Sequence, residues 1–187
     1  MQSDLLTTEQ LRLQVEKLHI QHIKLCQDNF LYFVQEVWPD FICRKEKQRS
    51  KWGHHQIIAN EFTKISDNKK GRLIINMPPR HTKSEFASVY FPAWIIGRNP
   101  KMKIMQVSHN TELAVRFGSK VRNIIDSPEY KQIFGDVKLR EDSKAKGRWE
   151  TNHGGEYYAA GVGASITGRG ADLLIIDDPH TEQDSMS

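Results

Sequence analysis

The feature that most constrains the fold of this chain is a strand-loop-helix pattern at residues 72–94. Residues 72–76, RLIIN, form a short apolar run that is typical of a buried strand. After a loop that ends in Lys83 and Ser84, apolar residues recur at helical spacing, although Pro92 predicts that this helix kinks or ends early. The recurring apolar residues are Phe86, Val89, Tyr90, Ala93 and Trp94. Because backbone N–H groups at the start of a helix point toward an anion, the pattern favours a phosphate-binding loop.

The loop itself differs from the usual phosphate-binding motif, G-x-x-x-x-G-K-[ST]. Aligning the motif on Lys83 and Ser84 places Met77 and Thr82 at the glycine positions, so both glycines are missing. Two prolines inside the loop restrict the backbone and can partly replace the turn that glycine permits. In this interpretation Lys83 reaches the β- and γ-phosphates and the Ser84 hydroxyl holds Mg²⁺. A proline-rich turn with solvated basic residues explains the loop equally well, so a second motif has to decide.

The second motif is GADLLIIDDPH at residues 170–180. Four apolar residues, Leu173–Ile176, predict a short buried strand that ends in two adjacent carboxylates. In P-loop NTPases an acid at the end of a neighbouring strand holds Mg²⁺, and Asp177 fits this role. Asp178 is the candidate base that positions or deprotonates the attacking water. Alone, the motif is slightly better explained as an Asp-Asp-Pro turn, but its occurrence together with the loop favours the nucleotide-binding interpretation.

Other segments of the chain predict alternating helices and strands. They are a helix behind a capping box of Thr7 and Gln10, a helix over residues 51–65, a strand over residues 103–107, an amphipathic helix capped by Asn110, and a strand over residues 156–160. This alternation predicts an α/β fold with a mainly parallel sheet flanked by helices. Residues 1–50 are expected to form an N-terminal helical lead-in, and residues 51–187 the core.

Composition excludes several classes of protein. With 187 residues, 38% hydrophobic and 27% charged, the chain suits one globular domain that buries a core. No run of about 18 apolar residues exists, and the N-terminus lacks the pattern of a secretory signal, so an intracellular protein is expected. Cys26 and Cys43 are too few for a disulfide scaffold and are not in metal-ligand spacing. The net charge of +4 permits a polyanionic partner without requiring one.

Three further groups of residues carry weaker signals. Gln56 can donate and accept at an adenine edge, although a surface glutamine is the simpler interpretation. Arg169 lies in a glycine-rich connection, where it can approach phosphate or DNA or belong to an ordinary turn. His19, His22 and Cys26 can share a helix flank as metal ligands, but nothing in the sequence completes such a site, and packed histidines are favoured.

From about residue 28 to the end, the chain resembles the ATPase half of large terminase subunits, the packaging motors of tailed bacteriophages. The segments that carry the resemblance are HHQIIANEF, RLIINMPPRHTKSEFASVYFPAWIIGRNP, VSHNTELAVRFGSKVRNIIDSPEYKQIFGD and GVGASITGRGADLLIIDDPH. The resemblance implies a P-loop NTPase fold of the ASCE type. It identifies residues 54–56, with Gln56, as the adenine-binding motif and residues 175–178 as the Walker B strand. The deviant Walker A loop comprises Pro79, Arg80, His81, Thr82, Lys83 and Ser84. Thr82 stands where the family usually has glycine, and Asp178 where glutamate is common.

The resemblance also implies cofactors, partners and a location. ATP and Mg²⁺ are the expected cofactors, with Arg80 and Lys83 on the phosphates, Ser84 and Asp177 on the metal, and Asp178 on the water. Double-stranded DNA, a portal protein and a small terminase subunit are the expected partners, and the motor is expected to form a homo-oligomeric ring on the procapsid. The expected location is the host cytoplasm, without membrane association.

The family pattern continues beyond residue 187, with a coupling-motif strand between the two phosphate strands, further sheet and a nuclease domain. The resemblance therefore implies an amino-terminal fragment or truncated product with an incomplete sheet, which is expected to be poorly stable and not to translocate or cut DNA alone. Two other functions fit the residues: a superfamily-two helicase or other DNA translocase, and a non-catalytic DNA- or portal-binding module with a vestigial nucleotide fold.

Overall fold

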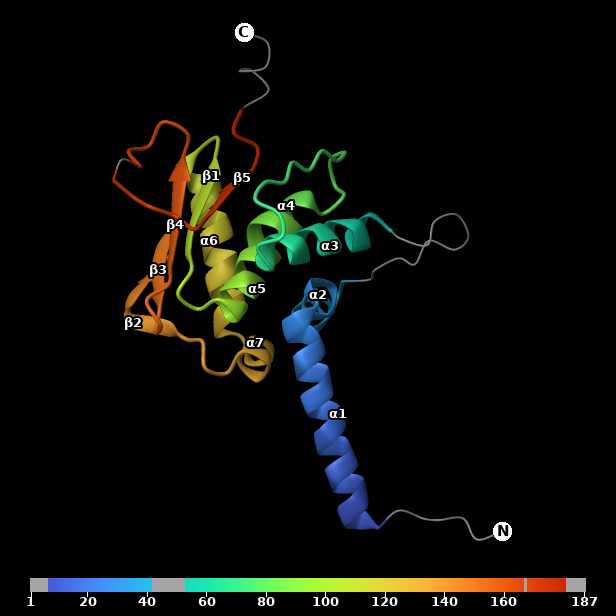
Figure 1. The fold of residues 1–187 in the computed structure, drawn as a ribbon. Helices are drawn as coiled ribbons and strands as arrows, with labels where there is room; N and C mark the ends of the chain where they lie inside the picture. The colour runs from blue at the N-terminus through green and yellow to red at the C-terminus, as the bar shows by residue number, and fades with distance from the viewer. Residues whose placement is uncertain (1–6, 42–52, 167, 181–187) are drawn as a thin grey trace.

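The computed structural model describes residues 7–41, 53–166 and 168–180 (Figure 1). The helices are α1 (Thr8–Asp28), α2 (Phe30–Val37), α3 (His54–Ser66), α4 (Lys83–Glu85), the π-helix η1 (Phe86–Tyr90), α5 (Phe91–Arg98), α6 (Thr111–Asp126) and α7 (Pro128–Ile133). The strands are β1 (Lys103–Ser108), β2 (Leu139–Ala145), β3 (Arg148–Thr151), β4 (Glu156–Gly161) and β5 (Leu173–Ile176). The predicted division at residue 50 falls outside the described residues, as does Cys43.

The five strands form one mixed sheet in the order β2-β3-β4-β1-β5. β1 runs parallel to both β4 and β5, whereas β3 runs antiparallel to both β2 and β4. The α/β class is therefore as predicted, but the expectation of a mainly parallel sheet is wrong. The antiparallel part of the sheet comes from the hairpin of β2 and β3. This hairpin carries too many charged residues to show the alternating apolar pattern from which strands are predicted.

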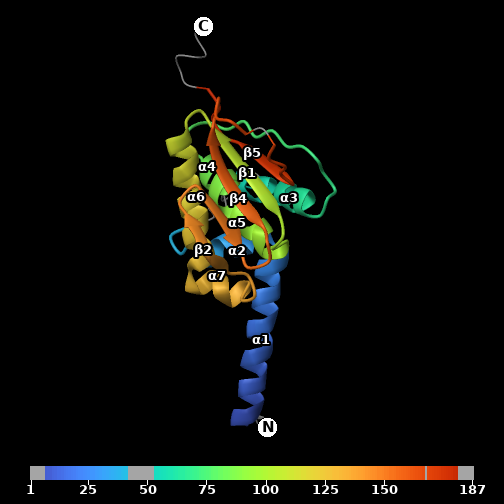
Figure 2. The same ribbon diagram turned by 90° about the vertical axis from the view of Figure 1, so that its left-hand side faces the viewer.

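The helices gather on one face of the sheet, as two perpendicular views show (Figures 1 and 2). α6 begins at the predicted cap, where the Asn110 side chain accepts a hydrogen bond from the Leu113 N–H, and it packs on β1 and β4. Gly118 permits this close approach, because a Cβ there would lie 2.9 Å from the Tyr157 ring. The buried Trp149 stacks on the Tyr157 ring at 4.9 Å and donates its indole N–H to the Gly118 carbonyl.

The N-terminal helices differ from each other in burial. α1 begins with the predicted capping box, in which Thr7 and Gln10 each bind the other's backbone N–H, and it projects away from the sheet (Figure 1). α2 is instead anchored in the core by Phe30, whose ring makes edge contacts with Phe62, Phe86, Phe91 and Trp94. No helix among the described residues is long and apolar enough to cross a membrane.

The strand predicted at residues 72–76 is absent. The chain there has no regular secondary structure, although it alternates as a strand would: Leu73, Ile75 and Met77 are half-buried and the residues between them are exposed. Ile74 is 86% exposed. A strand is defined by hydrogen bonds to a neighbour, and no described strand pairs with this segment.

The helix after the loop continues from Lys83 to Arg98 through α4, η1 and α5, so the prediction that it ends early at Pro92 is wrong. Pro92 lies in the first turn of α5, directly after the π-helix η1. The wider π turn changes the hydrogen-bond register just before the residue that lacks an N–H. The helix therefore continues through a proline that would end a regular one.

A groove of about 590 Å³ separates this unpaired segment from β5. One side of the groove is lined by residues 172–177. The other side is lined by Gly71, Arg72, Leu73, Ile75, Phe62, Ile65, Lys83, Ala87 and Phe91. Among the described strands β5 pairs with β1 alone, and its Leu174 and Ile176 are 54% and 57% exposed. β5 forms as predicted, but only one of its faces is buried.

Candidate functional site

The loop before α4 has a strained backbone. Arg80 and Thr82 both have φ near 63°, in the left-handed region that favours glycine. Thr82 is the residue that aligns with the second glycine of the phosphate-binding motif, and it is also the N-cap of α4. The backbone therefore adopts at position 82 a conformation that glycine would permit without cost. Pro79, Arg80 and His81 are exposed at the surface of this loop, and the His81 Nδ1–H donates to the Pro79 carbonyl at 2.9 Å.

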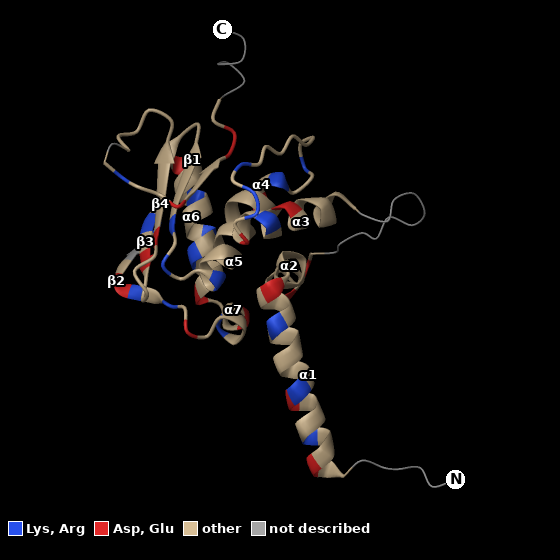
Figure 3. Ribbon diagram, viewed as in Figure 1, with Lys and Arg blue, Asp and Glu red and all other residues tan. Residues whose placement is uncertain are grey.

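Lys83 lies between the two carboxylates of the second motif. Its Nζ is 2.6 Å from Asp178 Oδ1 and 3.3 Å from Asp177 Oδ1, so segments far apart in the sequence meet as predicted. Figure 3 shows acidic residues directly after β5 and a basic residue in α4. Partial burial disfavours the Lys83 ammonium, but the hydrogen bond to Asp178 and the two negative charges outweigh it and raise the pKa of Lys83. The lysine is a stable cation in this position.

The two aspartates differ in environment. Asp177 is 5% exposed, whereas the Asp178 side chain is 57% exposed and its backbone has φ of 46°. A buried carboxylate is costly unless hydrogen bonds and opposite charge compensate it, whereas an exposed one is free to contact water. The Asp177 carboxylate is thus enclosed by the protein, whereas the Asp178 carboxylate faces solvent.

A chain of buried hydrogen bonds holds Asp177. The Ser88 hydroxyl donates to Asp177 Oδ2 at 3.0 Å, and the Gln106 side-chain N–H donates to the Ser88 oxygen at 3.2 Å. Ser88 and Gln106 are both 0% exposed, and Gln106 Oε1 has no hydrogen-bond partner. Neither Ser88 nor Gln106 was predicted as a site residue from the sequence. The available signal was Gln106, a polar residue within an apolar strand that needs a partner when buried.

The first turn of α3 supports the loop from the other side. His55 Nε2 lies 2.8 Å from the Thr82 hydroxyl, which donates its own hydrogen to the His81 carbonyl at 2.6 Å. The hydroxyl therefore accepts from a protonated Nε2, which assigns the neutral tautomer of His55. Burial, and then the nearby His54 and His81, lower the pKa of His55 to about 4. The imidazole is a neutral donor to the loop at physiological pH.

Gln56 does not join this group. Its amide donates to Asn60 Oδ1 at 2.9 Å, within α3.

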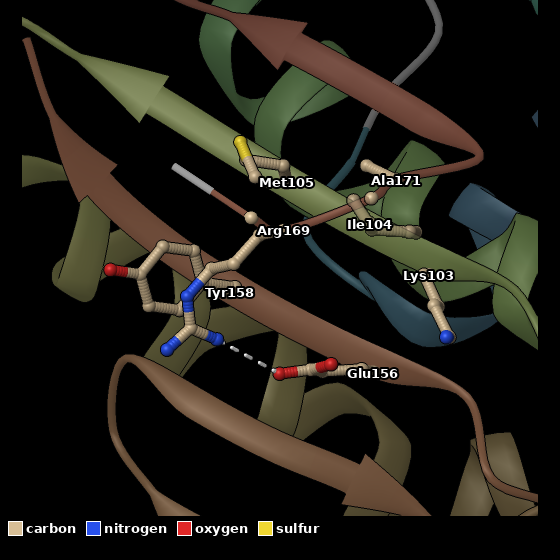
Figure 4. A pocket seen from close by; sticks show the side chains of 9 residues that line it. Lys103, Ile104, Met105, Glu156, Tyr158, Arg169 and Ala171 are labelled. Carbon is tan, nitrogen blue, oxygen red and sulfur yellow. Dashed lines mark hydrogen bonds and ion pairs between the residues drawn. The ribbon is translucent and has the colours of Figure 1, made fainter. Parts of the chain in front are cut away.

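Arg169 is held at the opposite end of the sheet. Its guanidinium stacks 4.1 Å above the Tyr158 ring and pairs with Glu156 at 3.4 Å, in a cavity of about 440 Å³ that also includes Lys103 (Figure 4). Glu156 and Lys103 are the first residues of β4 and β1, whereas Asp177 follows the last residue of the parallel strand β5. Arg169 is therefore not positioned to contact a phosphate bound at Lys83.

The remaining predicted ligand, Ser84, lies in the first turn of α4, next to Lys83. Ser84, Asp177 and Asp178 offer hydroxyl and carboxylate oxygens, the ligands that Mg²⁺ prefers. Lys83 and the backbone N–H groups at the start of the helix offer the complementary donors for an anion. Lys83 and Asp177 both line the groove, and Ser84 and Asp178 follow them directly in the chain.

Comparison with known proteins gives one similarity for this chain. Over 126 residues it is 28% identical to the "Terminase, large subunit" of Enterobacteria phage T3. The match covers 66% of this chain but 20% of that protein, so the chain spans about a fifth of the relative's length. No protein-family model matches the chain. No solved structure matches it either. The similarity is consistent with a relationship to terminase large subunits.

Proposed function

We propose that this chain is the ATP-binding part of a P-loop motor ATPase of the terminase large-subunit type, which drives double-stranded DNA into a procapsid. The observation that carries the proposal is the position of Lys83, at the start of a helix and between the carboxylates of Asp177 and Asp178. A nucleotide-binding site needs this cation and these oxygens together. The similarity to the phage T3 protein supports the terminase type over other P-loop ATPases.

In this proposal Lys83 and Arg80 bind the phosphates, and Ser84 and Asp177 hold Mg²⁺. Mg²⁺ held there would neutralise negative charge on the phosphates. The ion pair between Lys83 and Asp178 opens when the lysine turns to phosphate, which frees the exposed Asp178 carboxylate to orient the attacking water. Ser88 and Gln106 keep Asp177 in place through this change.

The remaining parts of the proposal concern the assembled motor. It acts in the host cytoplasm as a homo-oligomeric ring, with the portal protein and the small terminase subunit as partners. The groove beside β5 and its exposed edge support the idea that further sheet completes this part of the motor. DNA translocation therefore belongs to the complete protein.

The test is ATP binding and turnover by the full-length protein with the substitution Asp178→Asn. The amide has nearly the same size but is a far weaker base, so we expect Mg-ATP affinity within about threefold of the parent and turnover lowered by roughly a hundredfold or more. Asp136→Asn is the matched control, because that side chain is 88% exposed and lies outside the site. Unchanged turnover in Asp178→Asn would show that Asp178 is not the water-orienting group.

A further inference from the structure

Three metal-ligating side chains converge where α1 meets α2, away from the Lys83 site. His22 and Cys26 lie one turn apart on α1, and Glu36 reaches them from α2. The His22 Nε2 atom is 2.9 Å from Glu36 Oε2 and 3.7 Å from Cys26 Sγ. All three ligand atoms lie within 4.8 Å of one another. The structure thus supplies from α2 the third ligand that the sequence of α1 lacks, and His19 is not part of the cluster.

Hydrogen bonding alone does not satisfy this cluster. A neutral imidazole nitrogen is either a donor or an acceptor. If Nε2 carries hydrogen and donates to Glu36, it cannot accept from the Cys26 thiol. If it accepts from the thiol, its lone pair faces the Glu36 carboxylate. Protonating the ring leaves the thiol in the same position, because Nε2 is again a donor. Each arrangement leaves one of the two contacts to Nε2 without a hydrogen bond.

We propose that His22, Cys26 and Glu36 form a metal site of this chain and that its cation is Zn²⁺. A cation accepts electron pairs from all three atoms at once, which no arrangement of hydrogens can do. Sulfur, imidazole and carboxylate together are a ligand set that suits Zn²⁺, whereas Mg²⁺ and Ca²⁺ prefer oxygen alone. On binding, the thiol loses its proton to solvent and the thiolate becomes a ligand.

The distance between sulfur and nitrogen fits this assignment, and the Glu36 carboxylate oxygen lies within 4.8 Å of the Cys26 sulfur. Tetrahedral Zn²⁺ with Zn–S of about 2.3 Å and Zn–N or Zn–O of about 2.0–2.2 Å places its ligand atoms roughly 3.3–3.6 Å apart. The 3.7 Å between sulfur and nitrogen is already close to this range, and the 2.9 Å between nitrogen and oxygen requires a small movement of the Glu36 carboxylate. Cys26 is buried, whereas the side chains of His22 and Glu36 are 48% and 35% exposed. Water can therefore occupy the fourth position.

The site would fix the direction of α1. Residues 8–22 of this helix are exposed, and α1 makes its contacts with the rest of the molecule near its carboxyl end. A metal held by two residues of α1 and one of α2 would cross-link the two helices at the carboxyl-terminal part of α1. Removing the metal should loosen that junction without changing the core around Phe30.

The test is a Co²⁺ titration of the full chain, without an affinity tag, followed by displacement with Zn²⁺. We expect one equivalent of Co²⁺ to give a near-ultraviolet thiolate-to-cobalt absorption, which Zn²⁺ abolishes. Cys26→Ser should lose this absorption, and His22→Ala should weaken binding at least tenfold. Cys43→Ser and His19→Ala are the matched controls and should bind as the parent does. An absorption that survives Cys26→Ser, or that is lost in Cys43→Ser, overturns the proposal.

A second measurement needs no variant, so it does not depend on the folding of Cys26→Ser. X-ray absorption at the zinc edge of the loaded parent chain should show one sulfur ligand at about 2.3 Å and the rest nitrogen or oxygen at about 2.0–2.2 Å. A zinc ion without a sulfur ligand, or no zinc retained after dialysis, contradicts the site.

Discussion

Replacing Ser88 with alanine tests the buried hydrogen-bond chain behind Asp177. The substitution removes a hydrogen bond to a carboxylate, worth about 1.5–3 kcal/mol, and one from a neutral amide, worth about 0.5–1.5 kcal/mol. Because Ser88 is 0% exposed, water does not replace the lost hydroxyl. The substitution also leaves the Gln106 side-chain N–H without its acceptor, and the Gln106 side-chain oxygen already has no hydrogen-bond partner. We expect the free energy of unfolding to fall by about 2–4 kcal/mol.

Urea denaturation followed by circular dichroism measures this loss. With a slope of about 2 kcal/mol per molar, the midpoint should fall by roughly 1 M or more. Gln106→Met removes the amide that would lose its acceptor. In this background Ser88→Ala should lower the free energy of unfolding by about 1 kcal/mol less than it does in the parent. Ser119→Ala, at a half-buried serine of α6, is the control and should stay within about 0.5 kcal/mol. A loss below about 0.5 kcal/mol in Ser88→Ala, matching Ser119→Ala, refutes the reasoning.

Two further predictions concern the loop that contains Thr82. Thr82→Gly and Thr82→Ala both remove the hydroxyl that contacts His55, but only glycine adopts the left-handed backbone of position 82 without strain. Urea unfolding should therefore find the glycine variant more stable than the alanine variant by about 0.5–1 kcal/mol. Equal stability of the two variants would show that position 82 is not strained. For His55, the pKa is about 4 in the folded chain and near 6.5 when unfolded, so the unfolded chain binds more protons between these values. The contribution of neutral His55 to stability is complete above about pH 6.5 and is lost as the pH falls toward 4. Between these pH values the midpoint of the thermal melt should therefore fall less in His55→Gln than in the parent. An equal fall in both would contradict the lowered pKa.

Local signals in the sequence predicted several elements of the fold correctly. Thr7 and Asn110 act as helix caps as expected, because capping depends on residues within one turn. The strand predicted at residues 72–76 failed because its hydrogen bonds depend on a neighbour far away in the chain. The β2 hairpin was missed for a related reason: Arg140 pairs with Asp142 and Glu150 on an exposed face, so its pattern is polar.

The candidate site was predictable where it followed a motif. The meeting of Lys83 with Asp177 and Asp178 was expected from two motifs whose roles depend on each other. Ser88 was not expected, because the π-helix changes which residues of the turn face Asp177. Glu36 was not expected beside Cys26, because the direction in which α2 leaves α1 is determined by core packing around Phe30.

The most direct test of the Lys83 site is the thermal melt of this chain with and without Mg-ATP. A ligand that binds only the folded state stabilises it by about 2.7 kcal/mol at a hundredfold excess over its dissociation constant. We predict a cooperative melt whose midpoint rises with Mg-ATP in the parent and in Lys64→Ala, a surface control paired with Glu61, and does not rise in Lys83→Ala. A cooperative melt of the parent that is indifferent to Mg-ATP would contradict a nucleotide site at Lys83.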